Sequence, residues 1–428
     1  MAESAATIQI YGPDHMCIAW LTKYDILKWQ SNWHTPDSWE MRVPAHVVKD
    51  LEDTAINVDP STPEKHLFEL GGFVSCVVAG GERKFGSISI VTRSFNPAEG
   101  VDFWAVGGPG LEAAFGRRAC MSAITSNWLY KVVQITGTVE HCARELVKSE
   151  LTNPAKPARA IPEIRLEISD ESKTYKPSAG RKAEDYVFES KPLESLDQAL
   201  ERLSRYSDLA FKLRWTGADD PVNPWQFEFA TLQGADRRDE VILSPQNGSV
   251  LAYEVTEAST NTANTVFVVG RWLGAAWTTA VETLGIADHE HTGFARTECA
   301  IDGSDSLLSS GLRERGRRHL IDNRDKQIIK LGYNRHCECC VIGRDFFLGD
   351  KVTLDLDPKT IVSRVISVTD TWDLRGGHGI ELGVGHEAPD LRSVFDRFHR
   401  QDQDRASTEI VVDTKKAAKP KDTTGAHS

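Results

Sequence analysis

The chain has 428 residues, with 62 acidic against 50 basic side chains and a formal net charge of −12. Hydrophobic residues make up 40% and charged residues 26%, which is typical of a soluble globular protein and excludes a disordered or collagen-like chain. At roughly 150 residues per domain, the length predicts about three domains. The acidic balance argues against tight binding to the DNA backbone, although DNA could pass an acidic surface without adhering to it.

No apolar run reaches the roughly 18 residues that a membrane-spanning helix needs. The longest candidate, residues 265–280, is interrupted by Arg271. Residues 1–10 lack the basic and apolar segments of a signal peptide. We therefore expect the chain to fold in a cytoplasm and not to insert into a membrane.

Residues 1–105 are predicted to be rich in β-strands. Apolar and polar side chains alternate with a period of two in residues 8–11 and 38–44. Residues 73–79 and 87–92 are predicted as two further strands joined by a loop that contains glycine. This region also contains four tryptophans, which favour a hydrophobic core or an interface over a sugar site. They are Trp20, Trp29, Trp33 and Trp39.

Two amphipathic helices are predicted in the next part of the chain. Thr138 is the expected N-cap of a helix over residues 139–151, whose apolar side chains recur on one face. Ser195 and Gln198 have the spacing of a capping box and precede a second apolar stripe.

Strands are predicted again after the second helix. Residues 209–215 and 225–231 are expected to close an α+β unit, and residues 250–270 and 336–385 are also predicted as strands. The sequence after residue 390 predicts a short amphipathic helix followed by a mobile tail.

A short sequence echo suggests that one β-module occurs twice. Residues 73–78 resemble residues 361–366, and an alternating strand follows each of them, at 87–91 and 379–383. Short β-segments also match this well by chance, so a true repeat and a coincidence are equal alternatives.

The cysteines give the sharpest local pattern. In His336-Cys337-Glu338-Cys339-Cys340, an extended backbone would place Cys337 and Cys339 on one side and Cys340 on the other. With Cys299 as a distant fourth ligand, these three thiolates could hold zinc or an iron–sulfur cluster. The spacing is not that of the usual zinc knuckle, and the alternative is a strand with buried thiols, some of them oxidised to a disulfide.

No catalytic or nucleotide-binding motif is complete. G-x-S-x-G, the Walker loop and H-E-x-x-H are absent from the sequence. His289 and His291 form an H-x-H pair without the third ligand and base of a zinc peptidase. Residues 108–113 fit G-x-G-x-x-A, but no acidic residue follows at the required distance. The sequence therefore predicts no catalytic residue and no cofactor-binding residue, and the expected protein is not an enzyme.

Several short segments follow one another along the chain in a characteristic order. They include Ile8-Gln9-Ile10-Tyr11, Trp39-Glu40-Met41-Arg42-Val43-Pro44, Leu111-Glu112-Ala113-Ala114-Phe115-Gly116, Leu243-Ser244-Pro245-Gln246-Asn247-Gly248 and Gly343-Arg344-Asp345-Phe346-Phe347-Leu348-Gly349-Asp350. Over most of residues 8–388 this order resembles the tail-tip (baseplate) hub proteins of siphoviruses, which are phages with long non-contractile tails. The cysteine cluster, residues 153–192 and the tail after residue 390 depart from the family pattern.

The resemblance implies an α+β, mainly β, multidomain fold with two tube-type β-domains and inserted α+β domains. The expected divisions are an N-terminal tube-like β-domain (1–105), an inserted α+β domain (106–245), a second tube-like β-domain (246–272 with 331–390), a small inserted mixed domain (273–330), and a C-terminal helix with a flexible tail (391–428). Substitution of Gly349 or Asp350 is expected to damage the turn into residues 351–356 and, through it, assembly.

The resemblance also implies a non-enzymatic structural hub of the virion tail tip, assembled in the host cytoplasm. Such hubs form a homo-oligomer, usually a trimer, that closes the distal end of the tail tube. The implied partners are the distal tail protein, the tape-measure protein and tail fibre or receptor-binding proteins, while DNA passes through the channel without specific binding.

Two other functions stay open as alternatives. One is a hub that also degrades the host cell wall, although only about 40 residues follow the last β-segment, which is too few for a catalytic core. The other is a glycan receptor-binding module that uses the Trp-rich N-terminus.

Overall fold

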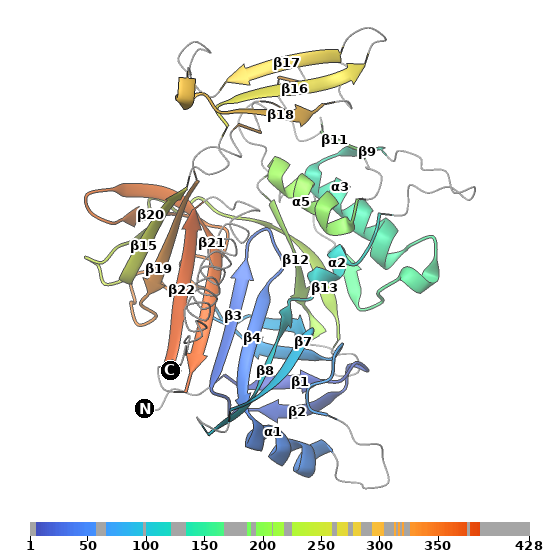
Figure 1. The fold of residues 1–428 in the computed structure, drawn as a ribbon, viewed down its shortest axis with the longest axis vertical. Helices are drawn as coiled ribbons and strands as arrows, with labels where there is room; N and C mark the ends of the chain where they lie inside the picture. Colours follow the sequence, from blue (N-terminus) through green and yellow to red (C-terminus); the bar gives the residue numbers. More distant parts are fainter. Residues whose placement is uncertain are drawn as a thin grey trace, which may run out of the picture. The chain divides into compact units, whose positions relative to one another are not determined.

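The structure is a computed structural model, and the chain divides into two compact units (Figure 1). The first contains residues 1–256 and 327–386, and the second contains residues 257–326 and 387–428. The residues described are 6–56, 66–96, 100–120, 134–166, 186–189, 194–207, 209–217, 225–258, 263–272, 277–283, 293–303, 312–313, 316, 319–320, 326–374 and 377–385. The expected C-terminal helix and tail lie outside this range.

A ten-stranded sheet is the largest element of the first unit (Figure 1). Eight of its strands follow one another in the order β15-β19-β22-β21-β3-β4-β8-β7. Their bounds are β3 Ile26–Asn32, β4 Ser38–Pro44, β7 Ile90–Asn96, β8 Val101–Pro109, β15 Val250–Ala258, β19 Lys326–Tyr333, β21 Thr360–Asp373 and β22 Gly377–Gly385. Off this path, β14 (Ile242–Leu243) pairs with β20 (Lys351–Asp355), which also pairs with β21.

The alternating sequences of this sheet explain which side chains are buried. Along β3 and β4 every second residue is buried, as the period-two pattern predicts. The buried set includes Trp29, Trp39 and Met41, and Trp33 lies just beyond β3. The tryptophans were predicted to form a core or an interface, and Trp29, Trp33 and Trp39 are core residues, whereas Trp20 is 63% exposed. Helix α1 (Ala45–Leu51) and the π-helical turn η1 (Glu52–Ile56) follow β4 directly.

A second, four-stranded sheet lies in the same unit and has the order β2-β1-β5-β6. Its strands are β1 Ile8–Tyr11, β2 Cys17–Leu21, β5 Phe73–Val77 and β6 Arg83–Ser87. Ile8 and Ile10 are buried in a core shared with Trp29 of β3, while Gln9 and Tyr11 point to the opposite face.

The inserted α+β part of the first unit is built around two helices and a three-stranded sheet of order β10-β13-β12. Its elements are α2 Ala113–Gly116, β9 Gln134–Gly137, α3 Val139–Val147, η2 Lys148–Thr152, η3 Pro157–Arg159, β10 Ile164–Leu166, β11 Tyr186–Glu189, α5 Leu196–Ser207, β12 Leu209–Trp215 and β13 Phe227–Gln233. Strands β9 and β11 pair with each other. Leu146 of α3 and Leu203 of α5 are buried in one core with Phe229 of β13.

The predicted cap of α3 forms completely, whereas that of α5 forms only in part. Thr138 Oγ1 accepts a hydrogen bond from the His141 N–H at 3.0 Å, which confirms the N-cap of α3. At the start of α5, the Ser195 N–H donates to Gln198 Oε1 at 3.1 Å. The Ser195 hydroxyl donates to Asp197 instead of accepting from the helix backbone, so one half of the capping box forms.

The second unit contains a three-stranded sheet of order β17-β16-β18. Its elements are β16 Thr265–Trp272, β17 Trp277–Thr283, the 3-10 turn η7 Gly293–Ala295 and β18 Glu298–Asp302. Val266 and Val268 are fully buried with Leu312 and Leu320. Residues 246–272, which we expected in one domain, are thus divided, because β15 pairs with β19 whereas β16 uses both of its edges within this sheet. Among the described residues, no helix is both long and apolar enough to cross a membrane.

Candidate functional site

The ten-stranded sheet contains the same arrangement of four strands twice. In chain order, the strands of one half are β3, β4, β7 and β8, and those of the other are β15, β19, β21 and β22. In space, both halves place these strands in the order first, second, fourth, third. The strand order thus repeats, but the segments that the sequence echo compared are not equivalent: residues 73–78 include β5 of the smaller sheet, whereas 361–366 belong to β21.

The two halves meet in the middle of the sheet, where β21, the innermost strand of one half, lies beside β3, the innermost strand of the other. There, β21 and β3 pair antiparallel over seven residue pairs, from Ser367 opposite Asn32 to Asp373 opposite Ile26. The Trp33 N–H extends the contact by donating to the Ile366 carbonyl at 2.9 Å. We call this the inner junction. It joins residues that are more than 300 positions apart in the chain into one continuous sheet.

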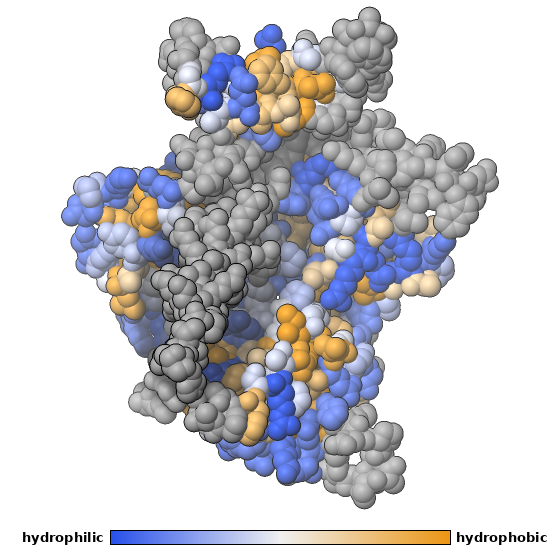
Figure 2. Space-filling view, viewed as in Figure 1, coloured by the Kyte–Doolittle hydropathy of each residue, from blue (hydrophilic) through white to orange (hydrophobic). Residues whose placement is uncertain are grey.

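Among the residues that the structure describes, the outer strand of each half has a neighbouring strand on one side alone. Within the described residues, β15 pairs only with β19, and β7 pairs only with β8. We call these two strands the open edges. Residues 251–255 of β15 are all exposed, and the large apolar ones among them are Leu251 (71%), Tyr253 (47%) and Val255 (39%). On β7, Ile90 (62%) and Phe95 (69%) are exposed. Figure 2 shows apolar side chains at the surface in both regions. Apolar strand edges of this kind are templates for pairing with another chain.

The turn at Gly349 and Asp350 supports the inner junction. Gly349 has a φ of 95° and donates its N–H to the Val365 carbonyl of β21 at 2.8 Å. A Cβ atom at this position would collide with the ring of Trp33. Only glycine therefore satisfies both the left-handed backbone and the close approach to Trp33.

Asp350 ties the same turn to the strand connection that precedes β14. Its Oδ1 accepts from the Ala235 N–H at 2.7 Å, and its Oδ2 accepts from Arg237 Nε at 3.0 Å and from the Phe347 N–H at 2.9 Å. The carboxylate is only 4% exposed. These contacts explain why the sequence places aspartate here and agree with the expectation that this turn organises the segment that follows it.

A buried group of charges fixes the inserted α+β part to the first half of the sheet. Asp37, in the loop between β3 and β4, lies 3.0 Å from the Nζ atom of Lys212 on β12 and 3.7 Å from that of Lys84 on β6. Lys212 also donates to the Thr35 carbonyl at 2.8 Å. Asp37 is 2% exposed, so these charges interact with little screening by water.

Burial and charge shift the pKa values of this group in opposite directions. Burial alone would raise the pKa of Asp37, but Lys212 and Lys84 outweigh it and lower that pKa below its usual value. The pKa of the neighbouring Glu112 is raised, first by burial and then by the negative charge of Asp37. The two carboxylates therefore differ in their tendency to ionise, because the lysines outweigh burial at Asp37, whereas burial and the charge of Asp37 outweigh the lysines at Glu112.

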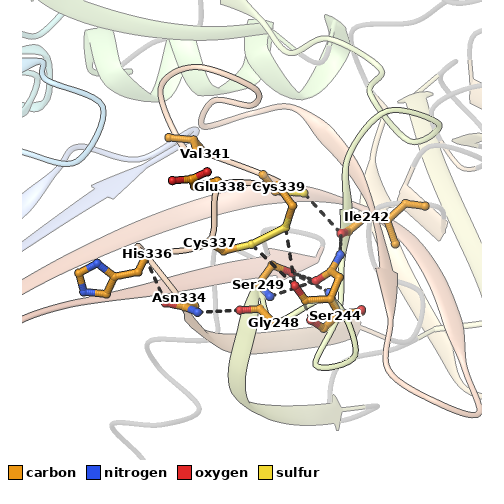
Figure 3. The surroundings of a disulfide bond; sticks show 12 residues. Ile242, Ser244, Gly248, Ser249, Asn334, His336, Cys337, Glu338, Cys339 and Val341 are labelled. Atoms are coloured by element: carbon orange, nitrogen blue, oxygen red, sulfur yellow. Dashed lines mark hydrogen bonds between the residues drawn. A yellow bond between two sulfur atoms is a disulfide. The ribbon is translucent and has the colours of Figure 1, made fainter.

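The cysteine cluster lies in the loop between β19 and β20 (Figure 3). Cys337 and Cys339 are joined by a disulfide, and both sulfur atoms lie 3.9 Å from the Asn247 carbonyl oxygen. Asn334 anchors the loop, because its Nδ2 atom donates to the Gly248 carbonyl at 2.8 Å. The side chain of His336 points away from the sulfur atoms (Figure 3).

The predicted metal ligands that lie in the first unit, Cys337, Cys339 and Cys340, do not present three thiolates to one point. The sulfur atoms of Cys337 and Cys339 are bonded to each other and offer no thiolate in this form. The Cys340 thiol is directed to the Ile242 carbonyl at 3.5 Å, and Cys299 lies on β18 of the second unit. In the described part of the chain, no three His, Cys, Asp or Glu side chains form a group that could hold a metal ion. Zinc or iron–sulfur binding stays a prediction, which applies to the reduced form.

Sequence reasoning located some of these features and missed others. The strand over residues 250–256 was predicted, and the alternation of Leu251, Tyr253 and Val255 was a signal for one apolar face, but not for its exposure. The group around Asp37 left no local signal, because Lys84 and Lys212 lie far away in the chain. His289 and His291 lie outside the described residues.

Comparison with known proteins gives one family match and several structural neighbours. A family model described as "Siphovirus ReqiPepy6 Gp37-like protein" matches residues 7–386. No curated protein matches the chain. Among solved structures, the tail protein from Neisseria meningitidis MC58 has 13% identity and a TM-score of 0.55, with 90% of this chain and 97% of that chain covered.

Two further solved structures are similar over comparable lengths. The 43 kDa tail protein of prophage MuSo2 from Shewanella oneidensis has 11% identity and a TM-score of 0.55, with 89% and 97% of the two chains covered. The prophage tail protein gp18 from Listeria monocytogenes EGD-e has 10% identity and a TM-score of 0.51, with 92% and 98% covered. At these identities the likeness establishes a shared fold.

Proposed function

We propose, from the premise that this chain belongs to the family of Siphovirus ReqiPepy6 Gp37-like proteins, that it is the structural hub of a phage tail tip. Its fold is that of phage and prophage tail proteins. In this proposal three copies assemble head to tail into a closed ring, in which an open edge of one copy pairs with the other open edge of the next.

One observation carries the proposal: the strand order of the sheet repeats within the chain. At the inner junction, β21 at the end of one half pairs with β3 at the start of the other, counted in their order across the sheet. Pairing β7 of one copy with β15 of a neighbour would create the same arrangement between chains. Such a contact is heterologous, and heterologous contacts form a ring when the rotation between copies closes.

The number of copies follows from the number of halves. A hub of the kind that the sequence resembles faces a tail tube of six-fold symmetry. Since each chain supplies two similar halves, three copies would present six. The ring would close the distal end of the tube and contact the distal tail protein, the tape-measure protein and the fibre or receptor-binding proteins. The net charge of −12 suits a channel through which DNA passes without specific binding.

The first experiment measures the mass of the purified protein in solution. The proposal predicts a particle of three times the chain mass of 47.5 kDa. A particle with the mass of one chain at all concentrations would contradict the ring.

The second experiment distinguishes head-to-tail pairing from other contacts. Tyr253→Asp places a charge on one open edge, and Phe95→Asp places a charge on the other, so each variant alone should be monomeric. A mixture of the two should form dimers, because each variant retains the edge that the other lacks. Leu70→Asp is the matched control, since Leu70 is 68% exposed but lies on neither open edge. The control should assemble as the unmodified chain does, and a mixture without dimers would contradict the proposed pairing.

A further inference from the structure

A pocket lies where the smaller sheet of the first unit meets the ends of β21 and β22. It has a volume of about 420 Å³, within the range of small-molecule sites. The smaller sheet contributes side chains from all four of its strands, and the ten-stranded sheet contributes two rings. The lining residues are Ala6, Thr7, Gln9, Trp20, Val77, Val78, Arg83, Trp372 and His378.

The polar wall of this pocket is rich in hydrogen-bond donors. The Arg83 guanidinium donates through Nη1 to two neutral acceptors, Gln9 Oε1 at 2.5 Å and Ser75 Oγ at 3.1 Å. Tyr11 donates to the same Gln9 oxygen at 2.7 Å. Within the described residues, no carboxylate pairs with Arg83, and the Gln9 amide nitrogen has no acceptor. Arg83 and Gln9 are therefore held in position and retain donors for a ligand.

The acidic groups close to the pocket are already occupied. Asp370 is 1% exposed, and its two oxygen atoms accept from the Ala79 N–H at 3.2 Å and bond to His378 Nε2 at 2.7 Å. Glu82 pairs with Lys84 at 2.9 Å. The pocket thus presents the positive charge of Arg83 on a chain with a net charge of −12. A ligand that offers negative charge and several acceptors fits this wall.

Aromatic rings form the other part of the pocket. The side chain of Trp20 is 63% exposed, although it is one of the largest apolar side chains of the protein. Trp372 stacks on the ring of His378, with the ring centroids 4.6 Å apart and the planes inclined by 6°. A flat apolar ring beside a guanidinium and an amide suits a ligand that has one apolar face and polar groups at its edge. Sugar rings combine these two properties.

We propose that this pocket binds an anionic saccharide unit, meaning a sugar ring that carries a carboxylate or a phosphate. Trp20 packs against the ring, Arg83 pairs with the acidic group, and the Gln9 amide donates to a ring hydroxyl. This binding site goes beyond the hub role, because the assembly of a ring through the open edges does not require it.

The test measures binding of four small probes to the full-length protein by titration calorimetry or ligand-observed NMR. The probes are glucuronate, glucose 6-phosphate, glucose and acetate. We expect at least one of the two anionic sugars to bind at least about tenfold more tightly than glucose and acetate, since a hydrogen-bonded charge pair is worth about that factor. Preference for glucuronate would assign a carboxylate, and preference for glucose 6-phosphate would assign a phosphate. Equal binding of glucose would overturn the proposed charge pairing, and equal binding of acetate would overturn the proposed ring contact.

Two variants connect the binding to the pocket. Trp20→Ala and Arg83→Gln should each weaken binding of the anionic sugar by about tenfold. The matched controls Phe294→Ala and Arg238→Gln should leave it unchanged, since Phe294 is an exposed aromatic residue of the second unit and Arg238 is paired with Asp236. Because Trp20 is exposed, Trp20→Ala should fold normally and decides the test even if Arg83→Gln does not fold. Unchanged binding in Trp20→Ala would refute the site.

Discussion

Strands β3 and β15 occupy the same place in the two halves of the sheet, yet one is covered and the other is open. Strand β3 pairs with β4 on one side and with β21 on the other, and every second side chain is buried. In β15, five successive residues from Leu251 to Val255 are exposed, and in the described part of the chain only β19 pairs with it. Strand β3 shows how a strand of one half pairs with a strand of the next half. Strand β15 has an edge at which, in the described part of the chain, no such pairing occurs.

The largest difference between the two strands should appear in stability. Trp29 of β3 is 1% exposed, so Trp29→Ala removes a large buried ring and should lower the free energy of unfolding by about 4 kcal/mol. Tyr253→Ala on β15 should change the stability of the isolated chain by less than about 1 kcal/mol. Chemical denaturation of both variants, monitored by circular dichroism, checks this prediction.

A milder variant at the same position sharpens the result. The Nε1–H group of Trp29 is buried and has no hydrogen-bond partner among the described residues. Trp29→Phe keeps an aromatic ring and removes this unpaired donor, so it should cost much less than Trp29→Ala. Equal losses for the two variants would show that the ring does not stabilise the inner junction by packing.

Local sequence patterns were sufficient to predict individual helices and strands, but not to predict which strands pair at the inner junction. The alternation of residues 38–44 and the cap at Thr138 depend on neighbours in the chain, and both were predicted correctly. The pairing of β21 with β3 joins distant residues, and its register depends on which apolar faces meet. For the same reason the echo between residues 73–78 and 361–366 suggested a repeat without identifying its equivalent strands.

The candidate sites divide in the same way. A strand and a turn could be predicted at residues 250–256 and at Gly349, because alternation and glycine are local signals. The Asp37 group and the pocket at Arg83 could not, because each combines side chains from separate strands that only the folded chain brings together. The cysteine pattern could be recognised, but whether its thiols are oxidised is a property of the chemistry of the loop and not of the spacing.

A second test concerns the turn that supports the inner junction. Gly349 and Gly71 both have a positive φ, of 95° and 87°, but a Cβ atom at Gly71 would meet no atom within 4 Å. Gly349→Ala adds a collision with Trp33 to the backbone strain that the two positions share. It should therefore destabilise the chain by about 2 kcal/mol more than Gly71→Ala does. Thermal unfolding of the two variants measures this difference.

The outcome also tests the link between this turn and assembly. If Trp33 and Gly349 hold the two halves of the sheet together, Gly349→Ala should lower the fraction of the protein in the oligomer, and Gly71→Ala should not. Equal effects of the two substitutions on stability and on mass would show that contact with Trp33 is unimportant and that only the backbone conformation matters.

The smallest effect is expected from the charges beside the β3–β4 loop. The pKa of Glu112 is raised in the folded chain by burial and by Asp37, so folding favours its protonated form. Below the pKa of the unfolded chain, Glu112 is protonated in both states and costs nothing. Between the unfolded pKa and the folded pKa, Glu112 loses its proton in the unfolded chain but keeps it in the folded chain. Raising the pH through this interval therefore lowers the free energy of unfolding. Glu112→Gln should therefore stabilise the protein by about 1 kcal/mol near neutral pH.

The pH dependence separates this cause from a change in packing. The advantage of Glu112→Gln over the unmodified chain should disappear near pH 4, where the glutamate is protonated as well. It should grow as the pH is raised toward the folded pKa of Glu112 and stay constant above it. Asp37 has a lowered pKa, so its contribution is lost on acidification in both proteins and cancels in the comparison. The Glu40 side chain is 71% exposed and pairs with Lys28, so the stability of Glu40→Gln should not differ from that of the unmodified chain in this pH-dependent way. If the difference in stability between Glu112→Gln and the unmodified chain were the same at every pH, the cause would be the shape of the side chain and not its charge.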